Sequence, residues 1–186
     1  MIDICRAYCQ KYCLQFNAKK SKVMIVGKNY DKPCSNIYIE NIPLESVDEL
    51  KYLGTTIKAG KQFGFPAGPD ISSFFRATNS VLNVLKGAHE HTLMHLLYSN
   101  CVPILTYACS VKEYSASDMS DCNTAMNSAL RRVFGFRDWR SIRVLRESFN
   151  FKSLYELFQE AKGHFLLSCH YNHNSIIRHI ASQINL

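Results

Sequence analysis

One short segment, residues 59–69, constrains what this chain can fold into more than any other feature. It holds three glycines and two prolines, whereas the whole chain of 186 residues has only 8 Gly and 5 Pro. Proline lacks a backbone donor and glycine adopts conformations closed to other residues, so such a segment interrupts regular structure. The hydrophobic periodicity also changes across it, from strand-like to helical spacing. We therefore predict an α+β chain: a strand-containing part over 1–58, a linker over 59–69, a helical bundle over 70–150 and a helical extension over 151–186.

The N-terminal part begins with an amphipathic helix pattern over residues 2–16. Cys5, Cys9 and Cys13 are spaced four residues apart and therefore share one helix face. Cysteine packs as a small hydrophobe, so we expect this face in the core rather than at a metal. The eight cysteines include no Cys-x-x-Cys pair and no export signal is visible, so we expect reduced thiols and an intracellular setting, cytoplasmic or nuclear.

Three strand-like runs follow this helix, at 23–26, 37–39 and 50–57. We expect them to form a small antiparallel sheet. The third run is expected as one continuous strand, with Leu53 in the core and Gly54 as a bulge or a point of close approach.

Beyond the linker, apolar residues keep the i, i+3, i+4 spacing of helices. Asp70 is placed to cap the first helix, Pro103 predicts a kink in the second, and Ser153 with Glu156 forms a capping-box pattern. The expected helices cover 70–87, 93–108, 117–133, 153–166 and 174–184.

Positive charge is concentrated in two segments, 1–30 and 131–152. The chain has 22 Lys and Arg against 15 Asp and Glu, a net charge of +7. Basic groups that neutralise phosphates release condensed counterions, so these segments favour a polyanionic partner; a plain solvated surface is the alternative. The second segment contains Arg131, Arg132, Arg137, Arg140, Arg143 and Arg146, with Trp139 between them.

The chain presents no complete active site by its own residues. It has no P-loop, G-x-S-x-G or H-E-x-x-H motif, and no two aspartates are adjacent, although two-metal chemistry needs clustered carboxylates. We therefore expect no metal or cofactor of its own and no specific small-molecule ligand. No window approaches the roughly 18 uncharged apolar residues of a membrane span, so no membrane partner is expected. A zinc-dependent module is an alternative, with ligands among His164, Cys169, His170 and His173, whose spacing matches no zinc pattern.

Four short strings occur in a fixed order along the chain. They are LQFNAKKSKVM at 14–24, LKYLGTTI at 50–57, VPILTY at 102–107 and NSALRRVFG at 127–135. In this order and at these separations they resemble the C-terminal part of the reverse transcriptases of non-LTR retrotransposons, over residues 2–165. In that family an Asn-x-x-Lys-Ser/Thr segment after the catalytic palm precedes a Tyr-Leu-Gly strand. A helical region with a Pro-x-Leu-x-Tyr string and a Leu-Arg-x-x-x-Gly string then follows.

The resemblance implies that 1–58 is a remnant of the polymerase palm. Asn17, Lys20 and Ser21 fall on the palm segment that closes near the incoming nucleotide, and Lys20 is the residue placed to contact the leaving pyrophosphate. The alternative is that the lysines here only solvate the junction between helix and strand. Tyr52–Gly54 falls on the primer-grip hairpin, which holds the 3′ end of the primer.

The resemblance also implies that 70–150 corresponds to the thumb, whose helices grip the template–primer duplex by shape and phosphate contacts. The arginines of the second basic segment are then the candidates for phosphate contact. Taken together, the expected nucleic-acid-binding residues are Asn17, Lys20, Ser21, Lys22, Tyr52, Leu53, Gly54, Arg131, Arg132, Arg137, Arg140 and Arg143.

The departures from the family concern catalysis. The family's box of two catalytic aspartates, which hold Mg²⁺, lies upstream of the Asn-x-x-Lys segment and is absent here, as are the fingers. The resemblance therefore implies a fragment of a transposable-element protein that is inactive as an RNA-directed DNA polymerase, with at most template–primer binding left. Its expected partners are an RNA–DNA or other nucleic-acid duplex and the missing polymerase half, which would cover the cysteine face and the hairpin. The alternative is a small helical protein-interaction module with no nucleic-acid role.

Overall fold

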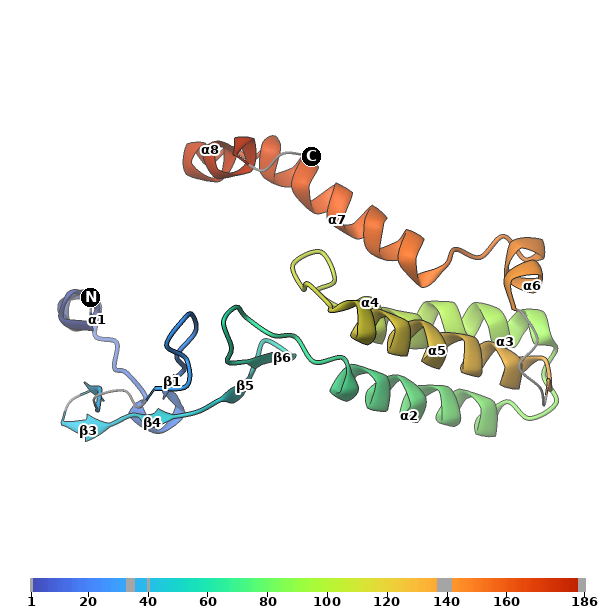
Figure 1. The fold of residues 1–186 in the computed structure, drawn as a ribbon, viewed down its shortest axis with the longest axis horizontal. Coiled ribbons are helices and arrows are strands. Elements are labelled where there is room, and N and C mark those ends of the chain that lie inside the picture. The colour runs from blue at the N-terminus through green and yellow to red at the C-terminus, as the bar shows by residue number, and fades with distance from the viewer. Residues whose placement is uncertain (1, 33–35, 40, 137–141, 184–186) are drawn as a thin grey trace. The chain divides into compact units, whose positions relative to one another are not determined.

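The computed structural model describes residues 2–32, 36–39, 41–136 and 142–183. The chain divides into two compact units, residues 1–66 and 67–186, and the division falls inside the Gly/Pro-rich segment. The strands lie in the first unit and the long helices in the second, so the predicted α+β class is confirmed (Figure 1).

The first unit opens with helix α1 (Ile2–Lys11), which is shorter than predicted. Cys13 adopts a left-handed backbone, φ 54°, and the amide of Leu14 donates to the carbonyl of Cys9 at 2.9 Å. This combination is typical of a Schellman-type helix end. Cys5 and Cys13 are exposed, and no described residue of α1 is buried. The expectation that the cysteine face lies in the core is therefore wrong for this chain, because the described part of the first unit leaves the side chains of α1 unburied.

The described strands of the first unit form three separate two-stranded ladders rather than one sheet. They are β1 (Lys22–Val23) with β4 (Glu45–Ser46), β2 (Tyr38–Ile39) with β3 (Ile42–Pro43), and β5 (Glu49–Tyr52) with β6 (Thr55–Lys58). The second and third ladders are antiparallel, as predicted, whereas β1 and β4 run parallel. Strands of two residues offer too few hydrogen bonds to extend into a wider sheet, so the ladders stay small.

The run at 50–57 is a hairpin, not one strand. Leu53 and Gly54 form its turn with φ angles of 45° and 81°, the pattern of a type I′ turn, which suits the twist of the flanking strands. The side chain of Leu53 is 74% exposed, so the prediction that it lies in the core is wrong. The apolar pattern of the sequence predicts a strand and not a turn here, because leucine is rarely found at positive φ.

Replacing Leu53 by asparagine should stabilise this hairpin by about 1 kcal/mol, since asparagine tolerates the left-handed backbone that leucine avoids. Hydrogen exchange followed by NMR should show the amides of β5 and β6 exchanging about fivefold more slowly. Leu50→Asn is the matched control, because Leu50 is half-buried within β5 and its replacement should speed exchange. Unchanged exchange in Leu53→Asn would contradict the turn.

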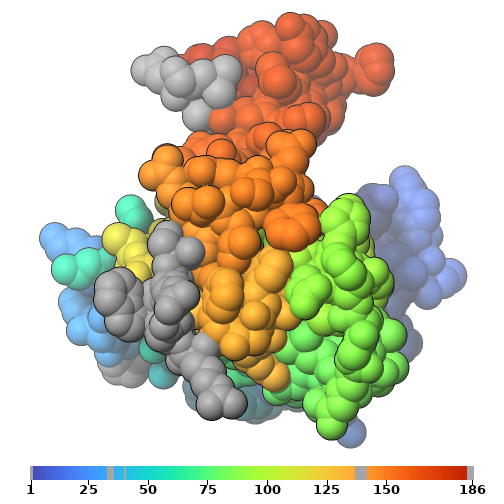
Figure 2. Space-filling model, turned by 90° about the vertical axis from the view of Figure 1, so that its right-hand side faces the viewer, coloured from blue at the N-terminus to red at the C-terminus, as the bar shows by residue number. Residues whose placement is uncertain are grey.

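The second unit is a helical bundle around one apolar core. Its elements are α2 (Gly68–Val84), α3 (Glu90–Leu96), a π-helical turn η2 (Leu97–Cys101), α4 (Val102–Thr106), α5 (Ala116–Val133), α6 (Arg143–Ser148), α7 (Leu154–His170) and α8 (Ser175–Ser182). The largest fully buried side chains include Phe74, Met94, Leu105, Met126 and Leu130. Figure 2 shows α3 in light green beside the orange surface of α5 to α7, in keeping with the packing of α3 on α5.

The predicted helix over 93–108 is divided by η2 into α3 and α4. Pro103 lies in the first turn of α4, immediately after the π-helical turn. Its ring clashes with the carbonyl four residues earlier in a regular helix, and a wider turn at that point relieves the clash. The structure thus has a change in helix type immediately before Pro103, and the kink predicted there stays a prediction.

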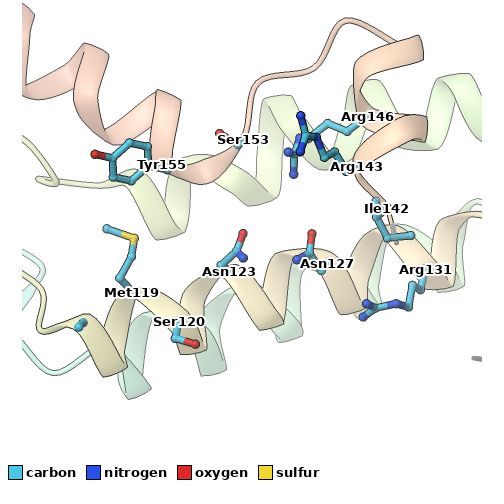
Figure 3. A pocket seen from close by; sticks show the side chains of 11 residues that line it. Met119, Ser120, Asn123, Asn127, Arg131, Ile142, Arg143, Arg146, Ser153 and Tyr155 are labelled. Carbon is cyan, nitrogen blue, oxygen red and sulfur yellow. The ribbon is translucent and has the colours of Figure 1, made fainter. Parts of the chain in front are cut away.

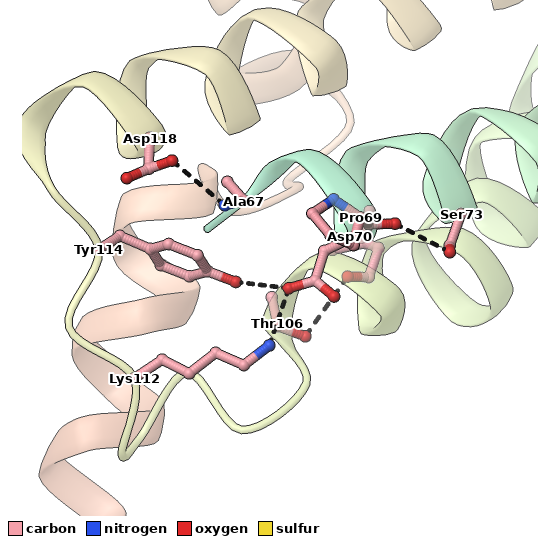
Figure 4. Close-up of polar contacts among 9 residues, drawn as sticks. Ala67, Pro69, Asp70, Ser73, Thr106, Lys112, Tyr114 and Asp118 are labelled. Carbon is pink, nitrogen blue, oxygen red and sulfur yellow. Dashed lines mark hydrogen bonds and ion pairs between the residues drawn. The ribbon is translucent and has the colours of Figure 1, made fainter. Parts of the chain in front are cut away.

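Polar contacts fix the start of α2 (Figure 4). The N-cap residue is Ala67, whose amide donates to Oδ1 of Asp118 at 3.1 Å, so the expectation that Asp70 caps this helix is wrong. One oxygen of Asp70 instead accepts from Lys112 Nζ at 2.8 Å and from the Tyr114 hydroxyl at 2.9 Å. The side chain of Lys112 is 1% exposed, and burial together with the bond to Asp70 raises the pKa of Tyr114 far above its usual range. The cluster is thus a buried ion pair with a neutral phenol.

We expect Asp70→Asn to lower the free energy of unfolding by about 3 kcal/mol, because it leaves Lys112 as an uncompensated buried charge. Urea unfolding followed by circular dichroism measures this loss. The double variant Asp70→Asn/Lys112→Met is the informative companion, since it leaves neither charge alone and should lose less than the two single variants combined. Strictly additive losses would show that the two side chains do not stabilise each other.

The described cysteines divide into an accessible and a buried group. Cys101, Cys109 and Cys122 are buried, and burial raises the pKa of each thiol, to about 12 for Cys122. Thiolate is the reactive form, so at about pH 8 iodoacetamide should modify Cys5 and Cys13 first and these three only after unfolding. Peptide mass spectrometry of a labelling time course measures the order. Early labelling of Cys122 in the folded chain would contradict it.

Candidate nucleic-acid interface

An open pocket of about 600 Å³ lies on the second unit between α5, α6 and the start of α7 (Figure 3). Arg131 of α5 and Arg143 and Arg146 of α6 line it. The amides of Asn123 and Asn127 line the α5 side. Among the described residues that line the pocket, none carries an acidic side chain, so its charge is positive.

The sequence of α5 explains why it supplies one wall of the pocket. Asn123, Asn127 and Arg131 are spaced four residues apart and therefore follow one face of the helix. The face around Met126 and Leu130 is fully buried in the core. Because one face is held in the core, the polar face is presented outward to the pocket.

The arrangement of α6 and α7 supplies the opposite wall. Ile142, just before α6, and Leu154, the first residue of α7, are 3% and 0% exposed, so both ends of the intervening segment are anchored in the core. Arg143 and Arg146 are three residues apart on α6 and share a face. In Figure 3 they extend toward the side of α5 that carries Asn127.

The ion pair between Arg143 and Glu147 is exposed to solvent. Nε of Arg143 lies 2.8 Å from Oε1 of Glu147, and this hydrogen bond raises the pKa of Arg143. The two side chains are 77% and 58% exposed, and water and salt screen exposed pairs of this kind strongly. A phosphate can therefore compete with Glu147 at little cost.

A second hollow of about 540 Å³ shares Arg143 and Arg146 with the first but also contains Glu147 and Glu156. The hydroxyl and amide of Ser153, which bond to Glu156 in the capping box, hold the pKa of that carboxyl below its usual value. Glu156 is therefore an anion at neutral pH. The first pocket is the better site for a phosphate, and the capping box predicted at Ser153 and Glu156 is confirmed.

The structure separates the arginines that the sequence grouped together. Arg131 and Arg143 line the pocket, whereas Nη1 of Arg132 donates to Oδ1 of Asn79 on α2 at 2.6 Å. Successive helical residues point in different directions, so Arg131 and Arg132 cannot share one site on α5. Arg132 therefore does not line this pocket, and its role in nucleic-acid binding stays a prediction. Arg137 and Arg140, with Trp139, lie outside the described residues.

Sequence reasoning did not include Asn123 and Asn127 among the expected binding residues, whereas it named Arg146 among the candidates for phosphate contact. Arg146 was visible as part of the basic segment 131–152. The two asparagines could have been found from their four-residue spacing ahead of Arg131, which places all three on one polar face.

In the first unit, Asn17, Lys20 and Ser21 lie together in one turn. The side chain of Asn17 caps the short 3-10 helix η1 (Ala18–Lys20) by accepting from the amide of Lys20 at 3.1 Å. The hydroxyl of Ser21 donates to the carbonyl of Asn17 at 2.9 Å. Through these bonds Asn17 and Ser21 stabilise the turn itself. The side chain of Lys20 is exposed.

Lys22 pairs with Glu45 across the β1–β4 ladder, so its charge is balanced within the unit. Tyr52, Leu53 and Gly54 are at the tip of the β5–β6 hairpin, where Tyr52 is 60% exposed. A role for any of these residues in nucleic-acid binding stays a prediction.

Within the described ranges, no group of three or more His, Cys, Asp or Glu side chains is placed to hold a metal ion. This finding gives no support to a zinc module at His164, Cys169, His170 and His173. No described helix has both the length and the apolarity needed to cross a bilayer.

The donors in the pocket suit the binding of an anion. The pocket offers guanidinium, amide and hydroxyl donors, which suit an anion with several oxygens. No protein-family model, curated protein or solved structure matches this chain. The geometry of the pocket and the motifs of the sequence are therefore the grounds for a functional proposal.

Proposed function

We propose that this chain binds the sugar–phosphate backbone of a nucleic-acid duplex through the pocket between α5, α6 and α7. We further propose that it is a fragment of a non-LTR reverse transcriptase that lacks the catalytic aspartates and has no polymerase activity of its own. The observation that carries the binding proposal is the gathering of Arg131, Arg143 and Arg146 on one open pocket whose described lining holds no carboxylate.

The dimensions of the polar face favour a polymer over a small anion. Asn123 and Arg131 are eight residues apart on α5, or about 12 Å along the helix axis, which is longer than a single phosphate. The pocket is open to solvent, and contacts of this kind fix the position of a duplex without reading its bases. This is the task that the thumb resemblance assigns to 70–150.

The exposed surface of the first unit is consistent with the fragment proposal. Ile4, Tyr8 and Tyr12 of α1 and its end are 74%, 60% and 52% exposed. Large apolar side chains gathered on one short segment are typical of a surface that a partner covers. In the proposal that partner is the missing part of the palm.

Arg131→Ala should weaken binding of an RNA–DNA hybrid and make the dependence of log K on log salt less steep by about 0.9, the amount expected for one lost phosphate contact. Arg146→Ala should act similarly. Fluorescence anisotropy at about 50 mM and 200 mM salt measures both quantities.

Arg132→Ala is the matched control, because it removes the same charge from the adjacent residue, whose side chain bonds to Asn79 instead of lining the pocket. Binding that is absent, insensitive to salt, or equally reduced by Arg131→Ala and Arg132→Ala would contradict the proposed interface.

A second candidate function is a protein-interaction module. The observation that favours it is a set of exposed apolar side chains on α8, where Ile176 and Ile180 are 67% and 57% exposed. If the wild-type chain binds no duplex, a protein-interaction module becomes the better explanation of the basic surface.

A further inference from the structure

We propose that His91 and His95 of α3 bind a divalent transition-metal ion of the zinc or nickel class. The two residues are one helical turn apart, and their Nε2 atoms are 3.2 Å from each other. Both side chains are exposed, and α3 lies on the surface of the second unit (Figure 2). The site is separate from the proposed nucleic-acid interface and does not depend on it.

The distance between the two nitrogens suits shared coordination. Imidazole nitrogens bind zinc at about 2.0–2.1 Å, so two of them at a tetrahedral angle lie about 3.3 Å apart. A metal ion placed between His91 and His95 therefore needs little movement of either ring. Imidazole is also the side chain that zinc, nickel and copper share as a preferred ligand.

In the metal-free chain the same distance fits a hydrogen bond, in which one Nε2 donates and the other accepts. For both Nε2 atoms to bind a metal ion, the donating ring must move its proton from Nε2 to Nδ1, so that each neutral ring offers a lone pair on Nε2. Protons and metal ions thus compete for the same nitrogen lone pairs.

Aromatic side chains hold the two rings in place. The ring centroid of His91 lies 5.9 Å from that of Phe149, and the ring of His95 lies 5.2 Å from Phe151. Phe151 in turn stacks on Tyr98 at 4.2 Å. Rings that are already oriented lose less conformational entropy when they bind, so the packing favours a metal site over a chance pair.

The neighbouring histidine has a different role. Nδ1 of His89 accepts from the amide of His91 at 3.2 Å and caps α3. No third side chain completes a larger metal-binding group within the described ranges. The remaining coordination positions are therefore expected to hold water, which gives a site with open positions.

Calorimetric titration of the full chain with Zn²⁺ or Ni²⁺ tests the proposal, after accessible thiols have been blocked with iodoacetamide. The wild type should bind one more equivalent than His91→Gln or His95→Gln, or bind it more than about tenfold more tightly, since loss of a direct ligand costs at least as much as loss of an outer partner. His179→Gln, a change on α8, is the matched control and should behave as the wild type. Equal binding by the wild type and both α3 variants overturns the proposal.

A measurement on the wild type alone guards against variants that fail to fold. Substoichiometric Ni²⁺, which is paramagnetic, should broaden the ring-proton NMR signals of His91 and His95 before those of His164, His170 and His179. Broadening that begins at any of those three, or that affects all the histidines equally, overturns the proposal.

Discussion

The bond between Asp70 and the buried ammonium of Lys112 fixes the geometry of the helical unit. Lys112 lies in the segment between α4 and α5, and its partner lies in the first turn of α2, so the pair joins parts of the chain that are 42 residues apart. Tyr114 adds a neutral donor to the same carboxylate oxygen. A charge with 1% of its side chain exposed is tolerated only beside such a partner, so the start of α2 has one compatible position against the segment that leads into α5.

The position of α5 in turn determines what the surface of this unit offers. Asp118, in its first turn, accepts from the amide of Ala67 and so ties α5 directly to the start of α2. The packing of α2, α3 and α7 on α5 then uses the apolar face, with Met126 and Leu130 fully buried. The remaining face carries Asn123, Asn127 and Arg131. A polar pocket beside α6 is thus a consequence of how tightly the other face of α5 is held.

Much of the fold could be predicted from local pattern. The helical spacing predicts α2, α5 and α7 with ends close to those in the structure, and the capping box at Ser153 marks the start of α7. The predictions are wrong where one local sequence pattern is compatible with two different structures. Leu53 fits a strand by composition but takes a left-handed turn. Cys5 and Cys9 fit a core face by spacing, yet burial depends on whether another element covers that face, and spacing along one helix carries no information about that.

The same distinction applies to the candidate site, where some features follow from local sequence and others from contacts between distant segments. By itself the sequence determined that residues 131–152 are rich in arginine and that Asn123, Asn127 and Arg131 share one side of a helix, because helical periodicity is a local property. Only the tertiary structure decided that Arg131 lines the same pocket as Arg143 and Arg146, and that the side chain of Arg132 bonds to Asn79 instead. The physical reason is the burial of Ile142 and Leu154, which anchors α6 and α7 beside α5, since contacts between distant segments are set by core packing rather than by neighbouring residues.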